Sequence, residues 1–179
     1  ENLALDEVLL EQADTLGETF RLWESAQQAV VLGRASRVDE EVDRKACGQL
    51  GIPILRRVSG GATIVTGPGC LMYGVTLDLN QRPELQAIDR AHCFVLQRIA
   101  DALRETCGDV ELAGTSDLVL RQRTVGSKQH DTLLKFSGNA LRIKRDWLLY
   151  HGTLLYDFDL PLIGQLLRTP PRHPAYREQ

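Results

Sequence analysis

Apolar residues recur at helical spacing in several parts of the chain. The longest run extends through residues 88–103, where an apolar residue recurs every three or four positions and predicts a helix ending near Gly108. A weaker stripe predicts an amphipathic helix over residues 2–14, closed by Gly17. Residues 39–50 carry an apolar residue every four positions behind an acidic first turn, so they predict one helix. Residues 160–167 predict the last helix, and Pro170, Pro171 and Pro174 predict an extended arm after it.

The remaining apolar segments are short and rich in β-branched residues, which is typical of strands. Strands are expected around residues 20–22, 29–32, 52–55, 63–66, 70–79, 117–120, 132–136, 140–143, 147–150 and 153–156. Strands that come in runs, with few helices between them, indicate an α+β fold with a mixed, mostly antiparallel sheet flanked by helices. We find no repeat and no linker, so residues 1–179 are interpreted as a single domain.

Composition narrows the function classes. Hydrophobic residues make up 43% of the chain and charged residues 25%, which is ordinary for a globular domain. The net charge of −3 argues against a general nucleic-acid binder and against a polybasic membrane protein. No apolar run approaches the roughly 18 residues of a membrane span, and no secretory leader is visible. Because the chain begins at Glu1, an N-terminal piece is expected to be missing.

The four cysteines have wide spacings and no CxxC pair, so neither a zinc site nor a disulfide framework is expected. Reduced thiols in a cytoplasmic protein are the simplest interpretation, with no tightly bound metal.

Three short segments carry candidate chemistry. Residues 56–62 read RRVSGGA, where small residues let the backbone approach a ligand and paired arginines supply positive charge for an anion. Residues 135–142 place Lys135 and Arg142 on either side of small residues, so that both could converge on one anionic group. His151 could donate to an acyl or phosphate oxygen. The alternative interpretations of these segments are structural: a hairpin turn, solvated cations and a structural histidine.

Together, in this order, the segments resemble the lipoate–protein ligase family, within the wider biotin/lipoate ligase and octanoyltransferase superfamily. Residues 2–7 (NLALDE) look like the family's opening helix, and residues 20–24 (FRLWE) with 30–34 (VVLGR) look like its first hairpin. The RRVSGG loop is similar to the family's acyl-binding loop, and residues 114–118 (GTSDL) stand where the family has a GRNDL-like segment. Residues 135–140 (KFSGNA) resemble the segment with the essential lysine, and residues 151–155 (HGTLL) resemble a family strand.

The resemblance implies a ligase that activates lipoate or octanoate with ATP and Mg²⁺ as acyl-AMP, then transfers the acyl group to an acceptor lysine. The implied acceptors are lipoyl domains of 2-oxoacid dehydrogenase E2 subunits and the glycine cleavage H protein, with no nucleic acid or membrane as partner. Lys135 is the implied catalytic residue, and Asp117 the residue that touches either the Mg²⁺ that accompanies ATP or the ribose. Arg57, Asp117, Lys135 and Arg142 are implied for the nucleotide phosphates. The implied acyl-site residues are Arg57, Ser59, Gly60, Gly61, Ala62, Lys135, Gly138, Ala140, His151, Gly152 and Thr153.

Departures from the family pattern keep other functions open. Ala62 replaces a glycine, Thr66 and Gly67 replace a His-Asp pair, and Thr115 and Ser116 replace Arg and Asn. An octanoyltransferase would instead use a cysteine thioester, for which Cys70 and Cys107 are candidates. A degenerate acyl-binding protein is a third possibility. A biotin ligase is disfavoured because its GRGRxGR loop is missing.

Overall fold

A six-stranded sheet forms the centre of the molecule. The computed structural model describes residues 1–123 and 131–168. The strand order is β1-β5-β9-β8-β7-β6, and every neighbouring pair is antiparallel. The strands are β1 (Thr19–Glu24), β5 (Cys70–Asp78), β6 (Val110–Ala113), β7 (Asp117–Arg123), β8 (Asp131–Lys144) and β9 (Trp147–Leu155).

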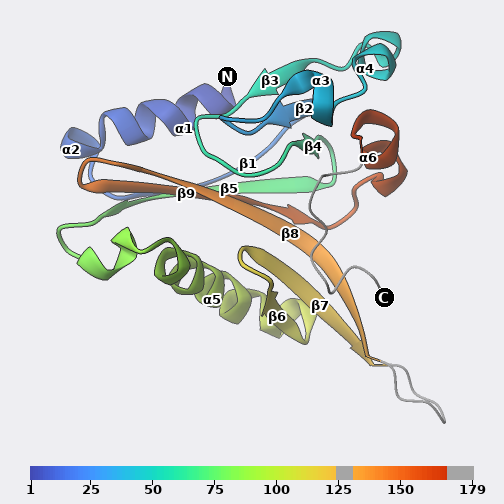
Figure 1. Cartoon of the computed structure of the whole chain (residues 1–179). Coiled ribbons are helices and arrows are strands. Elements are labelled where there is room, and N and C mark those ends of the chain that lie inside the picture. The colour runs from blue at the N-terminus through green and yellow to red at the C-terminus, as the bar shows by residue number, and fades with distance from the viewer. Residues whose placement is uncertain (124–130, 169–179) are drawn as a thin grey trace.

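Helix α5 (Ile88–Cys107) covers one face of this sheet, and α1 (Asn2–Glu11) with the short α2 (Ala13–Leu16) lies on the other (Figure 1). The stripe predicted for residues 88–103 is confirmed only in part, because Ile88 at its start is 57% exposed. Its members Ala91 and Val95 are buried against the sheet, with Ile99 and Leu103 partly buried beside them. They pack with two buried tyrosines of the sheet, Tyr73 and Tyr150. A 3-10 turn (Pro83–Gln86) leads into α5.

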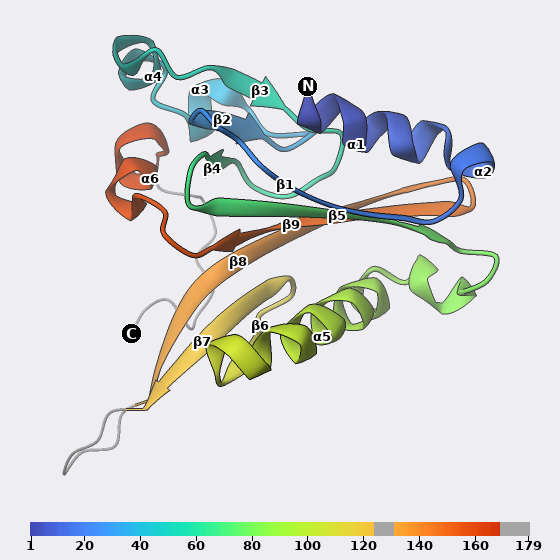
Figure 2. The same cartoon turned by 180° about the vertical axis from the view of Figure 1, so that it is seen from behind.

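A second, three-stranded sheet lies on the α1 side of the molecule (Figure 2). Its order is β3-β2-β4, with β2 (Ala29–Leu32) parallel to β3 (Ile54–Arg56) and antiparallel to β4 (Ile64–Thr66). Helices α4 (Arg44–Leu50) and α6 (Leu160–Leu166) contribute Cys47, Leu162 and Leu166 to its own apolar core.

The mixed, mostly antiparallel α+β fold is as expected, but several local expectations are wrong. Residues 20–34 do not form a hairpin, because β1 pairs with β5 in the large sheet while β2 belongs to the small sheet. Residues 39–50 are not one helix. They form α3 (Val38–Glu41) and α4, separated by the buried, extended Val42, which bridges to Leu167. The Asp43 side chain then caps α4 by accepting from the Ala46 backbone N–H at 2.9 Å.

The strands of the C-terminal half are longer than the sequence suggests. The segments expected at 132–136 and 140–143 are one strand, β8, and those at 147–150 and 153–156 are one strand, β9. Ser137 and Gly138 are therefore strand residues and not a turn, and His151 lies within a strand and not at its start. Strand β6 was not expected. The expected arm around Pro170 lies outside the described residues.

The four cysteines are free, as expected from their spacing; Cys47 and Cys70 are buried, whereas Cys93 and Cys107 are exposed on α5. Within residues 1–123 and 131–168, we find no helix of the length and apolarity that crossing a bilayer would require.

Candidate active site

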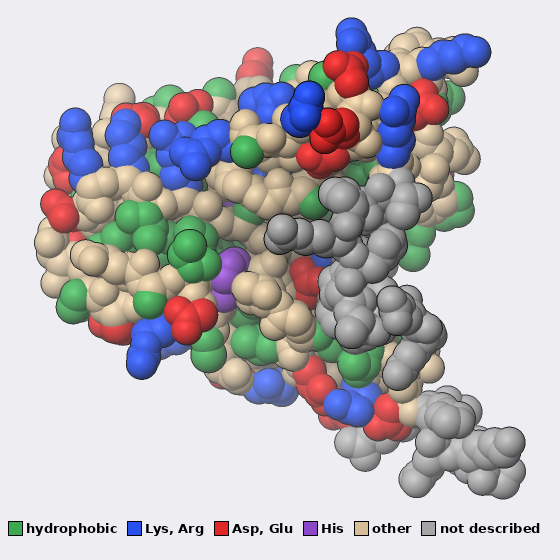
Figure 3. Space-filling view, in the orientation of Figure 1, with side chains coloured by type: hydrophobic (Ala, Val, Ile, Leu, Met, Phe, Trp, Pro, Cys, Tyr) green, Lys and Arg blue, Asp and Glu red, His purple; other side chains and the backbone are tan. Residues whose placement is uncertain are grey.

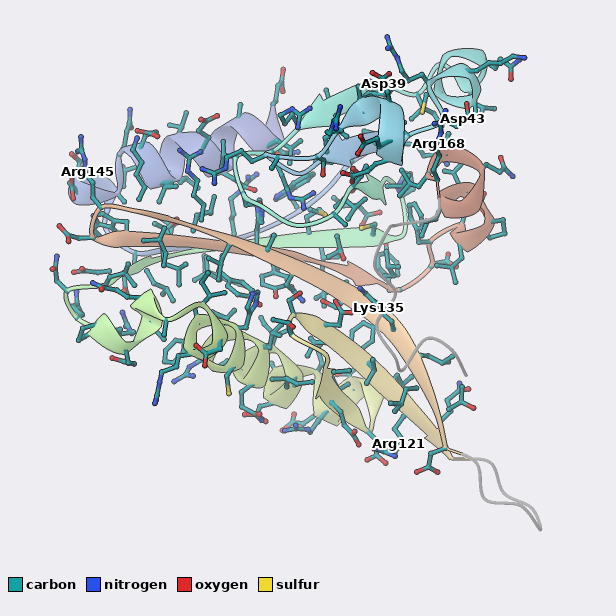
Figure 4. All side chains as sticks on the ribbon, in the orientation of Figure 1. Asp39, Asp43, Arg121, Lys135, Arg145 and Arg168 are labelled. Atoms are coloured by element: carbon teal, nitrogen blue, oxygen red, sulfur yellow. The ribbon has the colours of Figure 1, made fainter. Side chains whose placement is uncertain are left out.

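Lys135 and Asp117 form an ion pair on adjacent strands of the large sheet. Lys135 Nζ lies 2.7 Å from Asp117 Oδ1, and Asp117 is only 7% exposed. Lys135 lies in the first half of the long β8 ribbon, and Arg145 lies beyond the opposite end of that strand (Figure 4). The register shifts between Leu118 and Val119, which leaves Phe136 as an extra residue on β8. Such a bulge re-aims the neighbouring side chains, so the backbone irregularity lies directly beside this lysine.

Two cavities meet at this ion pair. The inner cavity, of about 160 Å³, extends between the sheets to Arg57, Met72 and His151. The outer cavity, of about 910 Å³, has an apolar wall from β4, β8, β9 and α6. The two share a boundary that includes Ala62, Ser116, Asp117, Lys135, Gly138 and Thr153. A ligand group at Lys135 is therefore reachable from both sides.

Arg57 holds the glycine-containing loop from inside. Its Nε donates to Ser59 Oγ at 3.1 Å, and its terminal NH2 group donates to the carbonyls of Gly60 at 2.6 Å and Ala62 at 2.8 Å. Burial lowers the pKa of Arg57 to about 10, and the negative charge of Glu41 opposes that shift. Gly61 has φ +84°, and a Cβ there would lie 2.9 Å from this guanidinium. The loop therefore needs glycine at Gly61 to close around the arginine.

Glu41 anchors the other end of the same loop. Its carboxylate accepts from Thr63 Oγ1 at 2.6 Å, from the Thr63 backbone N–H at 3.1 Å and from Ser36 Oγ at 3.0 Å. Burial acts to raise the pKa of Glu41, but the hydrogen bonds from Thr63, Ser36 and the Arg37 backbone outweigh it, so the net pKa is lowered. The loop is thus fixed by a cation at one end and an anion at the other.

A buried chain of hydrogen bonds lies behind the inner cavity. His151 Nε2 is 2.5 Å from Ser59 Oγ, and His151 Nδ1 is 3.1 Å from Asp6 Oδ2. Asp6 Oδ1 in turn accepts from Arg21 at 2.6 Å. The Asp6 carboxylate can only accept, so a neutral His151 ring donates to it from Nδ1 and accepts at Nε2 from the Ser59 hydroxyl, while Ser59 Oγ accepts from Arg57. His151 thereby carries its proton on Nδ1 and donates to Asp6, so both ring nitrogens are already bonded.

The structure gathers most of the residues implied by the family resemblance. The residues that line one or both cavities are Arg57, Gly61, Ala62, Asp117, Lys135, Gly138, Ala140, His151, Gly152 and Thr153. Ser59 and Gly60 support the loop without lining either cavity.

The expected basic pocket is smaller than the sequence suggests. Arg56 donates to the carbonyls of Gly33, Arg34 and Ser36, and Arg142 donates to the Val58 carbonyl at 3.3 Å. Neither arginine lines a cavity. Figure 3 shows many Lys and Arg side chains along the upper part of this face, over α1 and the small sheet. Among the expected cations, Arg57 and Lys135 are the ones that reach the cavities.

Sequence reasoning missed the polar residues that support the site. Asp6 is nearly buried although its neighbours Leu5 and Val8 are 43% exposed, the reverse of the expected amphipathic helix. The reason is the bond from Asp6 to His151, which no helical periodicity reveals. Asn139, inside the KFSGNA segment, lines the inner cavity and was also missed.

In the part of the chain that the structure describes, none of the four cysteines lines either cavity. Across the same residues, no group of three or more His, Cys, Asp or Glu side chains could hold a metal ion. The single carboxylate of Asp117 fits a magnesium ion brought by nucleotide phosphates, because Mg²⁺ is commonly bound through one or two carboxylates plus phosphate oxygens.

Residues 1–178 match the family model of the lipoyl protein ligase A/B catalytic domain, so the chain belongs to this family of ligases acting in lipoylation. The putative lipoate-protein ligase A of Schizosaccharomyces pombe is 30% identical over 169 residues, covering 94% of this chain and 41% of that protein. Lipoate-protein ligase LplJ of Bacillus subtilis is 27% identical over 159 residues, covering 87% and 42%.

Solved structures show the same fold. The bi-partite lipoate protein ligase of Thermoplasma acidophilum, studied with its E2 lipoyl domain, superposes with a TM-score of 0.77 at 23% identity, covering 94% of this chain and 61% of that one. A lipoate-protein ligase A bound with ATP superposes with a TM-score of 0.69 at 23% identity, covering 94% and 66%. The chain spans about two-fifths of the length of the curated relatives named above.

Proposed function

We propose that this chain forms the catalytic centre of an ATP-dependent lipoate–protein or octanoate–protein ligase. The observation that carries the proposal is the position of Lys135, at the boundary between a narrow inner cavity and a wide outer one. An acid and a nucleotide that entered these two cavities would meet at this lysine. The proteins described above as lipoate-protein ligases, one of them bound with ATP, support this proposal by their shared fold.

In the first step, a carboxylate oxygen of the acid forms a bond to the α-phosphorus of ATP, and the bond to pyrophosphate breaks. In the second step, the amine of an acceptor lysine attacks the acyl carbon, and AMP leaves. Both steps build negative charge, first on the α-phosphate oxygens and then on the acyl oxygen. A fixed ammonium group between the two cavities stabilises both charges, and Lys135 supplies it.

The other residues of the site bind either the acid or ATP. Arg57, Gly61, Ala62, Ala140, Gly152 and Thr153 surround the acid in the inner cavity. Asp117 would hold the magnesium ion that accompanies ATP, which would offset the negative charge of the phosphates, and its bond to Lys135 fixes the ammonium group. Lipoyl domains of 2-oxoacid dehydrogenase E2 subunits and the glycine cleavage H protein are the proposed acceptors.

An octanoyltransferase that uses a cysteine thioester is the main alternative. Cys70 is buried at the start of β5, where burial raises the pKa of its thiol, the opposite of what a nucleophile needs. Cys107 is exposed at the end of α5, on the opposite face of the sheet from the inner cavity. These positions favour the ligase.

ATP–pyrophosphate exchange, measured in parallel with lipoate, octanoate and biotin, tests the proposal. We expect exchange with lipoate or octanoate and none with biotin. Intact-mass measurement after incubation with octanoyl carrier protein is the complementary arm. A covalent octanoyl adduct on a cysteine, without exchange, would overturn the ligase in favour of the transferase. Binding of lipoate or octanoate without either reaction would indicate an acyl-binding protein.

A further inference from the structure

Asn139 connects three segments that meet at the inner cavity. Its Nδ2 donates to the carbonyl of Ser116 at 2.8 Å and to Ser137 Oγ at 3.0 Å. Its Oδ1 accepts from the hydroxyl of Tyr73 at 2.5 Å. One amide group thus joins β8 to β5 and to the turn between β6 and β7.

The orientation of this amide is fixed by its partners. Burial raises the pKa of Tyr73 well above its ordinary value, so the phenol stays protonated and donates. The Ser116 carbonyl can only accept, so Nδ2 must face Ser116, which leaves Oδ1 facing the Tyr73 hydroxyl that donates to it. If the Asn139 amide were rotated by 180°, it could not satisfy the same partners.

Gly152 makes room for this arrangement. It lies opposite Asn139 in the pairing of β8 with β9. A Cβ at this position would lie 1.7 Å from Asn139 Oδ1 and 2.8 Å from Tyr73 Cε1, which no side chain permits. The Asn139 side chain therefore crosses β9 over a glycine to reach β5.

Ser116 directly precedes Asp117, the carboxylate that pairs with Lys135. Residues 114–116 form the turn between Ala113 and Asp117, and Gly114 has φ +57°. Because the Asn139 amide donates to the last carbonyl of this turn, it fixes where the Asp117 backbone begins.

We propose that Asn139 is a positioning residue: it holds the Ser116–Asp117 segment against β8 and so sets the place of Lys135 for acyl-adenylate formation. The statement about the reaction rests on the proposed ligase function, whereas the statement about the segment does not. Asn139 acts through Asp117 and need not touch the reacting atoms.

Three variants separate the contacts of Asn139. Asn139→Ala removes them all. Asn139→Asp can still accept from Tyr73 but has no N–H for the Ser116 carbonyl. Tyr73→Phe keeps the bond to Ser116 and removes only the phenol donor. Asn80→Ala, at an exposed surface position, is the matched control for loss of an amide.

Two measurements are made on each variant. In ATP–pyrophosphate exchange with the preferred acid, we expect both Asn139 variants to lower kcat about tenfold or more, because small misplacements of reacting groups carry large rate penalties. KM for the acid should change much less than kcat, since Asn139 is one lining residue of the inner cavity and Arg57, Ala62 and the others remain. Tyr73→Phe and Asn80→Ala should retain most of the kcat of the unmodified protein.

Hydrogen–deuterium exchange of residues 114–117 supplies a second measurement that does not depend on catalysis. We expect faster exchange in both Asn139 variants and unchanged exchange in Tyr73→Phe and Asn80→Ala. Wild-type exchange and wild-type kcat in a folded Asn139→Ala protein would overturn the proposal, as would equal effects of Tyr73→Phe and Asn139→Ala. If the unmodified protein shows no pyrophosphate exchange with any acid, the ligase function fails, while the deuterium measurement still decides the role of Asn139.

Discussion

Lys135 Nζ lies 2.7 Å from Asp117 Oδ1, and both residues line both cavities. The carboxylate directs the ammonium group to the boundary between the cavities, where a carboxylic acid and a phosphate could both reach it. Fixed charges in a partly buried site are worth far more to a reaction than mobile charges in water. The pair is therefore the feature of this chain whose removal should matter most.

Lys135→Ala should abolish adenylate formation and leave the fold intact. Loss of one preorganised donor to a developing negative charge typically costs about 10²–10³ in rate. Lys144→Ala is the matched control, because Lys144 is on the same strand but pairs with Glu11 at the surface. Pyrophosphate exchange and circular dichroism of both variants test the prediction. A folded Lys135→Ala protein with exchange close to wild type would contradict the assignment.

Glu41→Gln should destabilise the protein at neutral pH but much less in acid. The folded state lowers the pKa of Glu41, so its stabilisation is complete above the unfolded pKa of roughly 4.3 and is lost as pH falls through the folded value. We expect a loss of about 1–2 kcal/mol in the free energy of unfolding at pH 7. Urea unfolding of both proteins at pH 7 and at acidic pH gives the difference. A difference that stays constant across this range would show that Glu41 is not the titrating group.

The ring of His151, when neutral, should carry its hydrogen on Nδ1. The donors are ordered from Arg57 through Ser59 and His151 to Asp6, which leaves Nε2 as an acceptor. Nitrogen chemical shifts of the ring, measured by NMR with selectively labelled histidine, distinguish the two tautomers. Ser59→Ala removes the donor to Nε2 and should cost about 1–3 kcal/mol, because a buried ring nitrogen loses its partner. An Nε2-protonated ring in the unmodified protein would refute this order of donors.

Two glycines should respond to alanine in opposite ways. Gly152→Ala should lower the free energy of unfolding by about 1–3 kcal/mol, because its Cβ would overlap Asn139. Gly48→Ala lies in α4 with open space around its Cβ position, so it should raise stability by about 0.5–1 kcal/mol. Thermal and urea unfolding of the two variants provide the comparison. Equal shifts in both would mean that the crowding at Gly152 is relieved elsewhere.

Features with local causes were predictable from the sequence. Sequence patterns that act within a few residues predicted three features: the apolar stripe of α5, the β-branched strand β4 and Gly51 at the end of α4. Lys135 was identified because its neighbours form a recognisable segment. In contrast, the 20–34 hairpin was wrong because strand pairing depends on residues far along the chain. Local apolar patterns carry no information about which sheet a strand joins.

Polar residues in the interior were hardest to predict. Asp6 occupies an inward position of α1 because His151 and Arg21 satisfy its carboxylate. Arg142 was assigned to a phosphate, yet the structure gives it a backbone carbonyl of the adjacent loop. The sequence alone does not show whether a charged side chain faces a ligand, a backbone carbonyl or water. Its role depends on partners that only the folded chain brings near.

The hydrogen bond between Asp6 and His151 joins residues 145 positions apart. The ribosome synthesises Asp6 long before His151. The Asp6 carboxylate therefore remains without its His151 partner until β9 has been synthesised. Contacts of such long range close late and slow the folding of a domain. His151, Gly152 and Thr153 of β9 line the inner cavity, so a chain cut short before β9 would lack that wall.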